Sequence, residues 1–181
     1  MSLNSLLESQ RIPLVLEQPC VVANPQDPNE YRGRFVEECV KRYLKHLGTV
    51  FHDNFPCEIG EIQFSKTPFD IHAIGEKGRI TYDGLCKIDD LQFALEIKSG
   101  RLNGYEANIP KALDYAARYF GQETPLFLFF SQNNSKQQDA QRIHNNYGNI
   151  VRCFDLGYSR NKLNKAIQSH KEAVHDVAPS A

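Results

Sequence analysis

The sequence predicts a single α/β domain in which helices flank a central mixed β-sheet. Its 181 residues, 41% of them hydrophobic, suit one globular domain with one sizeable core. Strand-like and helical periodicities also alternate along the chain, with strands close together in the first half and separated by helices in the second. The first half therefore predicts an antiparallel meander, and the second half predicts parallel strands joined by helical crossovers.

Each element is predicted from its own pattern. The proline-containing residues 1–30 predict a partly extended N-terminal arm. Apolar residues at steps of three and four over 31–47 predict a helix that ends at Gly48. Segments with alternating or β-branched residues predict strands at 49–52, 57–64, 69–74, 79–88 and 91–99. Further helices are expected at 109–120, 136–147 and 160–175, and further strands at 126–131 and 150–154.

These elements place one domain at 31–175 and a flexible tail at 176–181. The net charge of −1 argues against a domain that binds nucleic acid mainly through bulk positive potential. No apolar run approaches the roughly 20 residues that a membrane span needs, and the N-terminus lacks the basic and apolar regions of a secretory signal. Five cysteines without a CxxC motif indicate reduced thiols. We therefore expect a cytoplasmic protein, or one delivered to a target cell without a signal peptide, and no membrane partner.

Residues 79–99 carry the most informative pattern. If Asp89 and Asp90 form a two-residue hairpin turn, every pair of opposed residues has numbers that sum to 179. One face then pairs apolar or small residues throughout: Ile88 with Leu91, Cys86 with Phe93, Gly84 with Leu95, and Tyr82 with Ile97. This consistency supports the register. The other face places Asp83 opposite Glu96, and Thr81 opposite Lys98.

The register predicts that Asp83, Glu96 and Lys98 converge on one point. Opposed Cβ atoms lie about 5 Å apart, so the two carboxylates repel each other unless a cation lies between them. Such a pair suits Mg²⁺, with Mn²⁺ as a substitute, and a neighbouring lysine could orient a water or stabilise a phosphoryl group. The alternative is that these are solvent-exposed residues of an amphipathic hairpin. The helix expected at 109–120 favours a site, because it would cover this polar face.

The spacing of these residues resembles the PD-(D/E)xK nuclease superfamily, which has the restriction-endonuclease-like fold. Asp83 is followed thirteen residues later by Glu96-Ile97-Lys98, within an α-β-β-β-α-β order of elements. The resemblance covers residues 33–154, and its local sequence is similar to branches that include bacterial toxin and effector nucleases. The chain departs from the pattern at Tyr82, because the superfamily commonly has proline before the first carboxylate.

The resemblance implies a catalytic set of Glu37, Asp83, Glu96 and Lys98. Asp83 and Glu96 would bind the metal, and Lys98 would position the nucleophile. The first helix of the superfamily often supplies a glutamate, so Glu37 would hold a second metal or a metal-bound water. Glu38 is the alternative if the helix is rotated by one residue. Asp70 competes with Asp83 as the first carboxylate, although it is not registered opposite Glu96.

Basic residues around this set predict where a substrate would bind. Phosphate contacts need local positive charge even when the whole chain is nearly neutral. The candidates lie on the first helix, on the hairpin, in the loop after it and on the next helix: Arg34, Lys87, Arg101 and Lys111.

The sequence thus predicts a Mg²⁺-dependent endonuclease that hydrolyses DNA phosphodiester bonds, with RNA as the other candidate substrate. A toxin or effector role would add a cognate inhibitor protein as a partner, and a homodimer would allow both strands to be cut. The alternative function is a non-catalytic nucleic-acid-binding or protein-interaction module that keeps the restriction-endonuclease-like fold.

Overall fold

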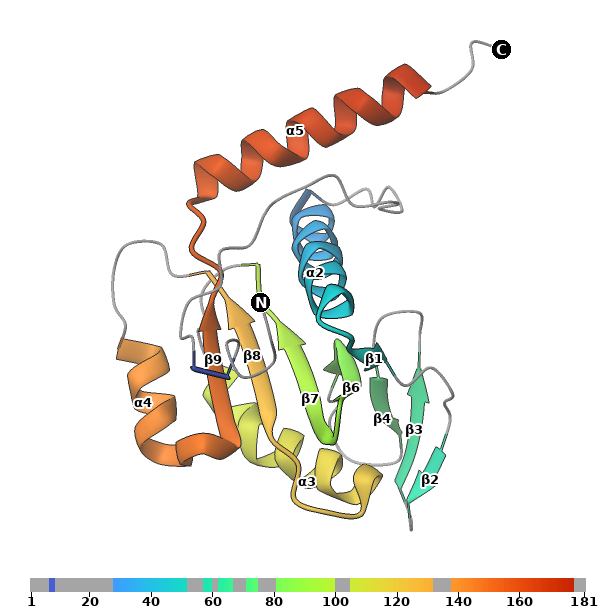
Figure 1. The fold of residues 1–181 in the computed structure, drawn as a ribbon, viewed down its shortest axis with the longest axis vertical. Helices are drawn as coiled ribbons and strands as arrows, with labels where there is room; N and C mark the ends of the chain where they lie inside the picture. Colours follow the sequence, from blue (N-terminus) through green and yellow to red (C-terminus); the bar gives the residue numbers. More distant parts are fainter. Residues whose placement is uncertain are drawn as a thin grey trace.

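A five-stranded mixed open sheet forms the centre of the molecule (Figure 1). The structure is a computed structural model that describes residues 7–8, 28–51, 57–59, 62–66, 71–74, 81–99, 105–131 and 138–177. Across the sheet the strands lie in the order β1 (Val50–Phe51), β6 (Gly84–Ile88), β7 (Leu91–Ile97), β8 (Leu126–Phe130) and β9 (Val151–Asp155). The predicted α/β class is therefore confirmed.

The sheet changes from antiparallel to parallel at β7. Strands β1, β6 and β7 pair antiparallel, whereas β7 with β8 and β8 with β9 pair parallel. This confirms the predicted meander followed by crossovers, because parallel neighbours need a helical connection between them. Counted along this sheet alone, the elements from the first helix to β8 follow the order α-β-β-β-α-β.

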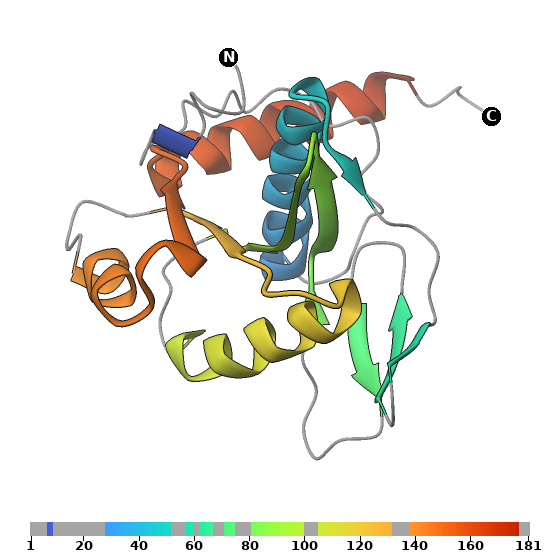
Figure 2. The ribbon, with the colours of Figure 1, turned by 60° about the horizontal axis from the view of Figure 1, so that its bottom comes forward.

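The described part of the chain contains four α-helices, three of which cover the two faces of the sheet. Helix α2 (Pro28–His46) packs against one face, and α3 (Ile109–Phe120) and α4 (Gln138–Tyr147) pack against the other. Helix α5 (Arg160–Val177) packs on α2, where His170 lies beside Tyr31 and Phe35. Figure 2 shows α2 and α3 on opposite sides of the strands. Short 3-10 turns, η1 (Tyr105–Asn108) and η2 (Gly148–Ile150), precede α3 and β9. No helix among the described residues is long and apolar enough to cross a bilayer.

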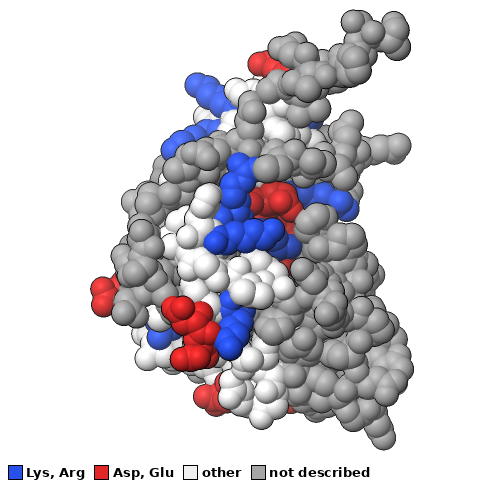
Figure 3. All heavy atoms as spheres, turned by 45° about the vertical axis from the view of Figure 1, so that its right-hand side comes forward, with Lys and Arg blue, Asp and Glu red and all other residues white. Residues whose placement is uncertain are grey.

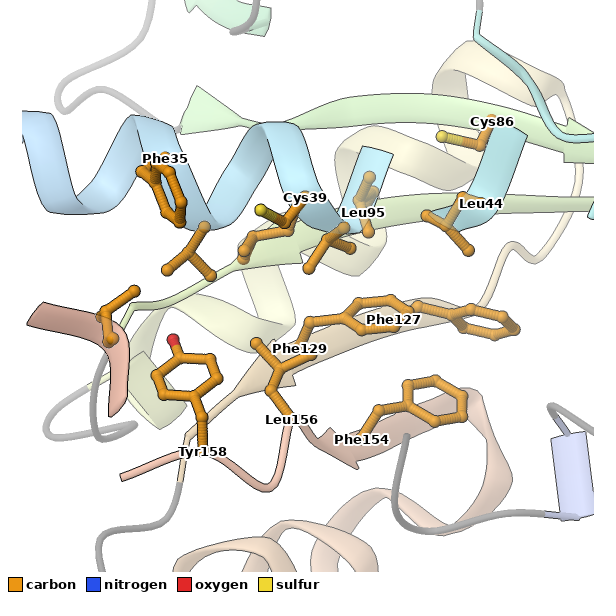
Figure 4. Packing of buried hydrophobic residues seen from close by; sticks show 14 of the residues in the cluster. Phe35, Cys39, Leu44, Cys86, Leu95, Phe127, Phe129, Phe154, Leu156 and Tyr158 are labelled. Atoms are coloured by element: carbon orange, nitrogen blue, oxygen red, sulfur yellow. The ribbon is translucent and has the colours of Figure 1, made fainter. Parts of the chain in front are cut away.

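The core has one hydrophobic cluster on each face of the sheet. Figure 4 shows the first, in which Phe35 and Leu44 lie on the side of α2 that faces β8 and β9, with Leu44 above Phe127 and Phe35 on the side of Tyr158. Phe127 stacks on Phe93 of β7, with ring centroids 4.4 Å apart. The second cluster lies under α3 and α4 and contains Leu85, Ala94, Ala112, Ala116 and Ile143. Both faces of the β6–β7 hairpin are therefore covered, as the helix at 109–120 led us to expect.

A second, four-stranded antiparallel sheet corrects two strand predictions. It contains β2 (Cys57–Ile59), β3 (Ile62–Lys66), β4 (Ile71–Ile74) and β5 (Thr81–Tyr82), in that order. The strand predicted at 57–64 is wrong, because this segment folds back on itself and pairs Cys57 with Phe64. The strand predicted at 79–88 is also divided, because Thr81 and Tyr82 pair with β4. Tyr82 consequently lies opposite Ile71, not Ile97.

The two terminal helices extend beyond the boundaries that the sequence predicted. Helix α2 begins at Pro28, inside the predicted arm, since proline is tolerated in a first helical turn. Helix α5 continues to Val177, two residues into the predicted tail. Figure 1 shows α5 at the end of the molecule toward which β7, β8 and β9 point.

Candidate functional site

From Gly84 to Ile88 the β6–β7 hairpin has the register that the sequence predicted, whereas Thr81 lies opposite His72 and not opposite Lys98. Gly84 lies opposite Leu95, Cys86 opposite Phe93, and Ile88 opposite Leu91. The turn is the two-residue Asp89-Asp90 turn, with Asp89 at a φ of 50°. Aspartate tolerates this left-handed conformation because its short side chain can hydrogen-bond locally.

Asp83 lies where the chain passes from the second sheet into the hairpin. Its N–H donates to the carbonyl oxygen of Leu95 at 3.0 Å. Its carboxylate oxygen Oδ2 accepts the N–H of Ile97 at 2.5 Å. The backbone before Asp83 turns away from β7 into the second sheet. The Asp83 side chain therefore accepts the Ile97 N–H in place of a backbone carbonyl group of the neighbouring strand. This hydrogen bond fixes the carboxylate beside the backbone of β7, next to Glu96.

Glu96 and Lys98 form an ion pair at the end of β7. The carboxylate oxygen Oε1 of Glu96 contacts Nζ of Lys98. The Glu96 side chain is 4% exposed and that of Lys98 is 39% exposed, so the acid is buried while the ammonium group reaches the surface. Nζ of Lys98 also lies 5.0 Å from the ring centroid of Tyr105, which is buried in η1. This cation–π contact holds the lysine over the start of the α3 segment.

The pKa of Asp83 is raised well above its usual value. Burial of the carboxyl group is the largest cause and the charge of Glu96 is the second, whereas the Ile97 N–H and the charges of Lys41 and Lys98 act in the opposite direction. Asp83 and Glu96 are thus close enough to repel each other in a poorly solvated place. A cation bound between them would relieve this repulsion.

Helix α2 contributes a second ion pair beside this pair of carboxylates. Nζ of Lys41 contacts Oε1 of Glu37, one helical turn earlier. Lys41 is buried, at 8% exposure, and its charge acts on Asp83. Figure 3 shows Lys and Arg side chains gathered around a group of acidic atoms on one face of the molecule.

Lys41 is the member of this cluster that sequence reasoning did not single out. Its signal is the i, i+4 spacing from Glu37, which places both residues on one side of a helix. This spacing is common on solvated helices and therefore has little predictive value without the packing of α2 on the sheet.

The other predicted residues are not all near Asp83. Lys87 is exposed near the hairpin turn, four residues along β6 from Asp83, or about 13 Å at the usual strand rise. Arg34 is half-buried, one turn before Glu37 and Glu38 on α2, and Lys111 is half-buried in the first turn of α3. Arg101 and Asp70 lie outside the described residues.

The donor set fits a hard divalent cation with an incomplete protein cage. Among the described residues, no three His, Cys, Asp or Glu side chains come together as a metal site. Mg²⁺ usually takes only one or two carboxylates and completes its octahedron with water and phosphate oxygens. Asp83 and Glu96 would supply those two carboxylates. Comparison of the chain with protein-family models, curated proteins and solved structures finds no match in any of the three.

Proposed function

We propose that this protein is a divalent-metal-dependent nuclease that hydrolyses DNA phosphodiester bonds. The observation that carries the proposal is the junction at Asp83, where a half-buried and a buried carboxylate lie together and Lys98 reaches the surface beside them. An acidic pair that is largely removed from water is electrostatically costly, and it usually has a functional reason. A phosphate substrate supplies oxygen ligands that such a two-carboxylate site leaves open.

The fold and the charge distribution support the same proposal. The α-β-β-β-α-β order along the main sheet is the order of a restriction-endonuclease-like core, and we propose that the chain has this core. Asp83 directly precedes β6 and hydrogen-bonds to β7, and Glu96 lies on β7, an arrangement that is compatible with the PD-(D/E)xK pattern. Arg34 and Lys111 lie on the two helices that flank the hairpin, where they could contact a nucleic-acid backbone.

In this proposal, Asp83 and Glu96 hold Mg²⁺, or Mn²⁺ in its place. The ion would supply charge neutralisation at the phosphate and a water with a lowered pKa. Lys98 reaches the surface from the end of β7, so its ammonium group can donate hydrogen bonds to a phosphate oxygen and stabilise negative charge that develops there. Tyr105 and Glu96 hold this side chain from two directions, which limits the rotamers from which it acts.

The test is cleavage of supercoiled plasmid DNA with Mg²⁺, compared with EDTA and with a Lys98→Ala variant. We expect the parent protein to nick the plasmid only with the metal. We expect Lys98→Ala to be slower by about 10²-fold or more, which is typical when a charge-stabilising donor is removed. Lys165→Ala is the matched control, because Lys165 is exposed on α5 and lies outside the proposed site. It should cleave like the parent.

Two outcomes would contradict the proposal at different points. Intact DNA and intact RNA in every lane would favour a non-catalytic binding module. Cleavage by Lys98→Ala at the rate of the parent would overturn the assignment of Lys98 while leaving nuclease activity in place.

A further inference from the structure

Helix α2 places a buried cation beside the acidic pair, and this bears on how many metal ions the site takes. We propose that the site holds one divalent ion, on Asp83 and Glu96, and that Lys41 replaces a second ion by neutralising Glu37. The proposal rests on the proposed function for the presence of a metal, but its test counts ions and does not depend on cleavage.

The first observation is the ion pair itself. Oε1 of Glu37 contacts Nζ of Lys41, and the two side chains are only 13% and 10% exposed. Because Lys41 is itself largely removed from water, it cannot release Glu37 to a metal by moving its charge into solvent, whereas Lys98, at 39% exposure, can release Glu96. Breaking a buried ion pair leaves a charge without compensation, which is strongly unfavourable.

The second observation is the grouping of the acids. Within the part of the chain that the structure describes, no set of three potential ligands converges, so Glu37 does not join Asp83 and Glu96 in one cage. The charge of Lys41 nevertheless acts on Asp83. The ammonium group therefore lies on the α2 side of the acidic pair and repels a second dication that approaches from that side.

The combined charges favour a single ion as well. When a bound ion keeps Asp83 ionised, Glu37, Asp83 and Glu96 together carry three negative charges, and Lys41 and Lys98 carry two positive charges. One divalent ion changes the net charge of this cluster from negative to positive, so that the cluster then attracts a phosphate. A second divalent ion would add charge that, among the residues that the structure describes, no third ligand carboxylate at the site balances.

The experiment is a titration of the whole protein with Mn²⁺, in which the electron paramagnetic resonance signal of the hydrated ion measures free metal. We expect one bound ion in the parent protein. Glu37→Gln should also bind one ion, with a Kd within about threefold of the parent. Asp83→Asn should bind at least tenfold more weakly. Asp90→Asn, a carboxylate removed from the exposed turn of the same hairpin, is the matched control and should bind like the parent.

Two tightly bound ions in the parent, or no bound ion, would overturn the inference, and so would a Glu37→Gln variant that binds as weakly as Asp83→Asn.

Lys41→Met tests the lysine directly. It frees Glu37, so we expect a second, weaker ion, and a count that stays at one would overturn the role of Lys41. If Lys41→Met does not fold, as circular dichroism would show, the Glu37→Gln result decides alone. One bound ion without cleavage of any nucleic acid would contradict the proposed function and leave this inference standing.

Discussion

At the scale of single residues, Asp83 has both a structural and an electrostatic role. Its Oδ2 accepts the N–H of Ile97 where the neighbouring strand diverges, which keeps the edge of β7 hydrogen-bonded. The same bond holds the carboxyl group against Glu96, and burial together with that charge raises its pKa. This position therefore favours the protonated form of Asp83 when no cation is bound. Keeping Asp83 ionised there costs folding stability, as is common for residues retained for function.

This cost predicts the effect of Asp83→Asn on stability. Because the folded-state pKa of Asp83 is raised, the folded protein holds this proton more tightly than the unfolded chain. Stability is then lost as pH rises from the ordinary aspartate pKa through the raised one. Asparagine is neutral and still offers an oxygen to Ile97, so the variant should escape this loss.

The measurement is thermal unfolding in EDTA between pH 4 and pH 8. We expect Asp83→Asn to have the higher Tm at pH 7.5, by about 2–4 °C for each kcal/mol regained, and the difference to shrink toward pH 4. A variant that melts below the parent protein at pH 7.5 would show that the carboxylate stabilises the fold. Asp90→Asn should show no such pH-dependent gain.

The residue scale also shows what the sequence could and could not predict. The approach of Asp83 to Glu96 follows from the two-residue periodicity of strands and from one turn, so it could be read from spacing alone. The proximity of Lys41 to Asp83 depends on how α2 lies across the sheet. Local spacing pairs Lys41 with Glu37 but does not show how α2 packs on the sheet, so the sequence alone does not place Lys41 in the site.

At the scale of elements, the hairpin and the crossover helices were predictable, and the division of the first hairpin strand was not. Alternating apolar residues continue through Tyr82, so the pattern alone favours one long strand to Ile88. The structure instead pairs Tyr82 with Ile71. The residues Glu76-Lys77-Gly78 predict a turn between the two segments, but they do not show that the pairing across it takes Tyr82 away from β7.

The loop between β9 and α5 supports the chain at the end of β7, next to Lys98. Tyr158 is 3% exposed, and its hydroxyl donates to the carbonyl oxygen of Ser99 at 3.2 Å. Its own carbonyl oxygen accepts the hydroxyl of Ser131 at 2.7 Å. Burial, the largest cause, raises the pKa of Tyr158 above its usual value, so the phenol keeps its proton and remains a donor. The backbone N–H of Lys98 itself donates to the carbonyl oxygen of Phe129 in β8 at 2.8 Å.

We therefore predict that Tyr158→Phe lowers kcat without changing KM for DNA. Loss of the hydroxyl frees the chain after Lys98, and small displacements of a positioned group can cost up to about 10²-fold. We expect a fall of about 3- to 30-fold in plasmid cleavage, and faster hydrogen exchange at the Lys98 amide than at Ala94. Tyr147→Phe, on half-buried Tyr147 in α4, is the control. A Tyr158→Phe variant with the kcat of the parent would contradict the prediction.

At the scale of the whole molecule, the sheet holds the site because both of its faces are packed. Phe127 of β8 lies at the centre of the first cluster, fully buried, between Phe93 and Phe154. Its ring joins three adjacent strands beneath α2. The α/β class was predictable at this scale because every helix has an apolar side that needs a sheet to cover.

Phe127→Ala should destabilise the protein by about 3–5 kcal/mol, since it removes a large buried ring and leaves a cavity. For a chain of this size this corresponds to a fall in Tm of roughly 10 °C. Urea unfolding followed by circular dichroism measures the change. Phe120→Ala, at the half-buried end of α3, should cost less. A loss below about 1 kcal/mol at Phe127 would mean that the cluster is not the main core.

The two-residue turn at Asp89-Asp90 also has a consequence for the order of folding. Asp83 and Glu96 meet within one hairpin, and an isolated hairpin closes in about 1–10 μs. The parallel pairing of β7 with β8 and of β8 with β9 must wait for longer loops to close around α3 and α4. We therefore expect the acidic pair to be brought together early, while α2 still has to dock. The repulsion between the two carboxylates then opposes folding from its first steps, and a divalent cation present during refolding should speed it.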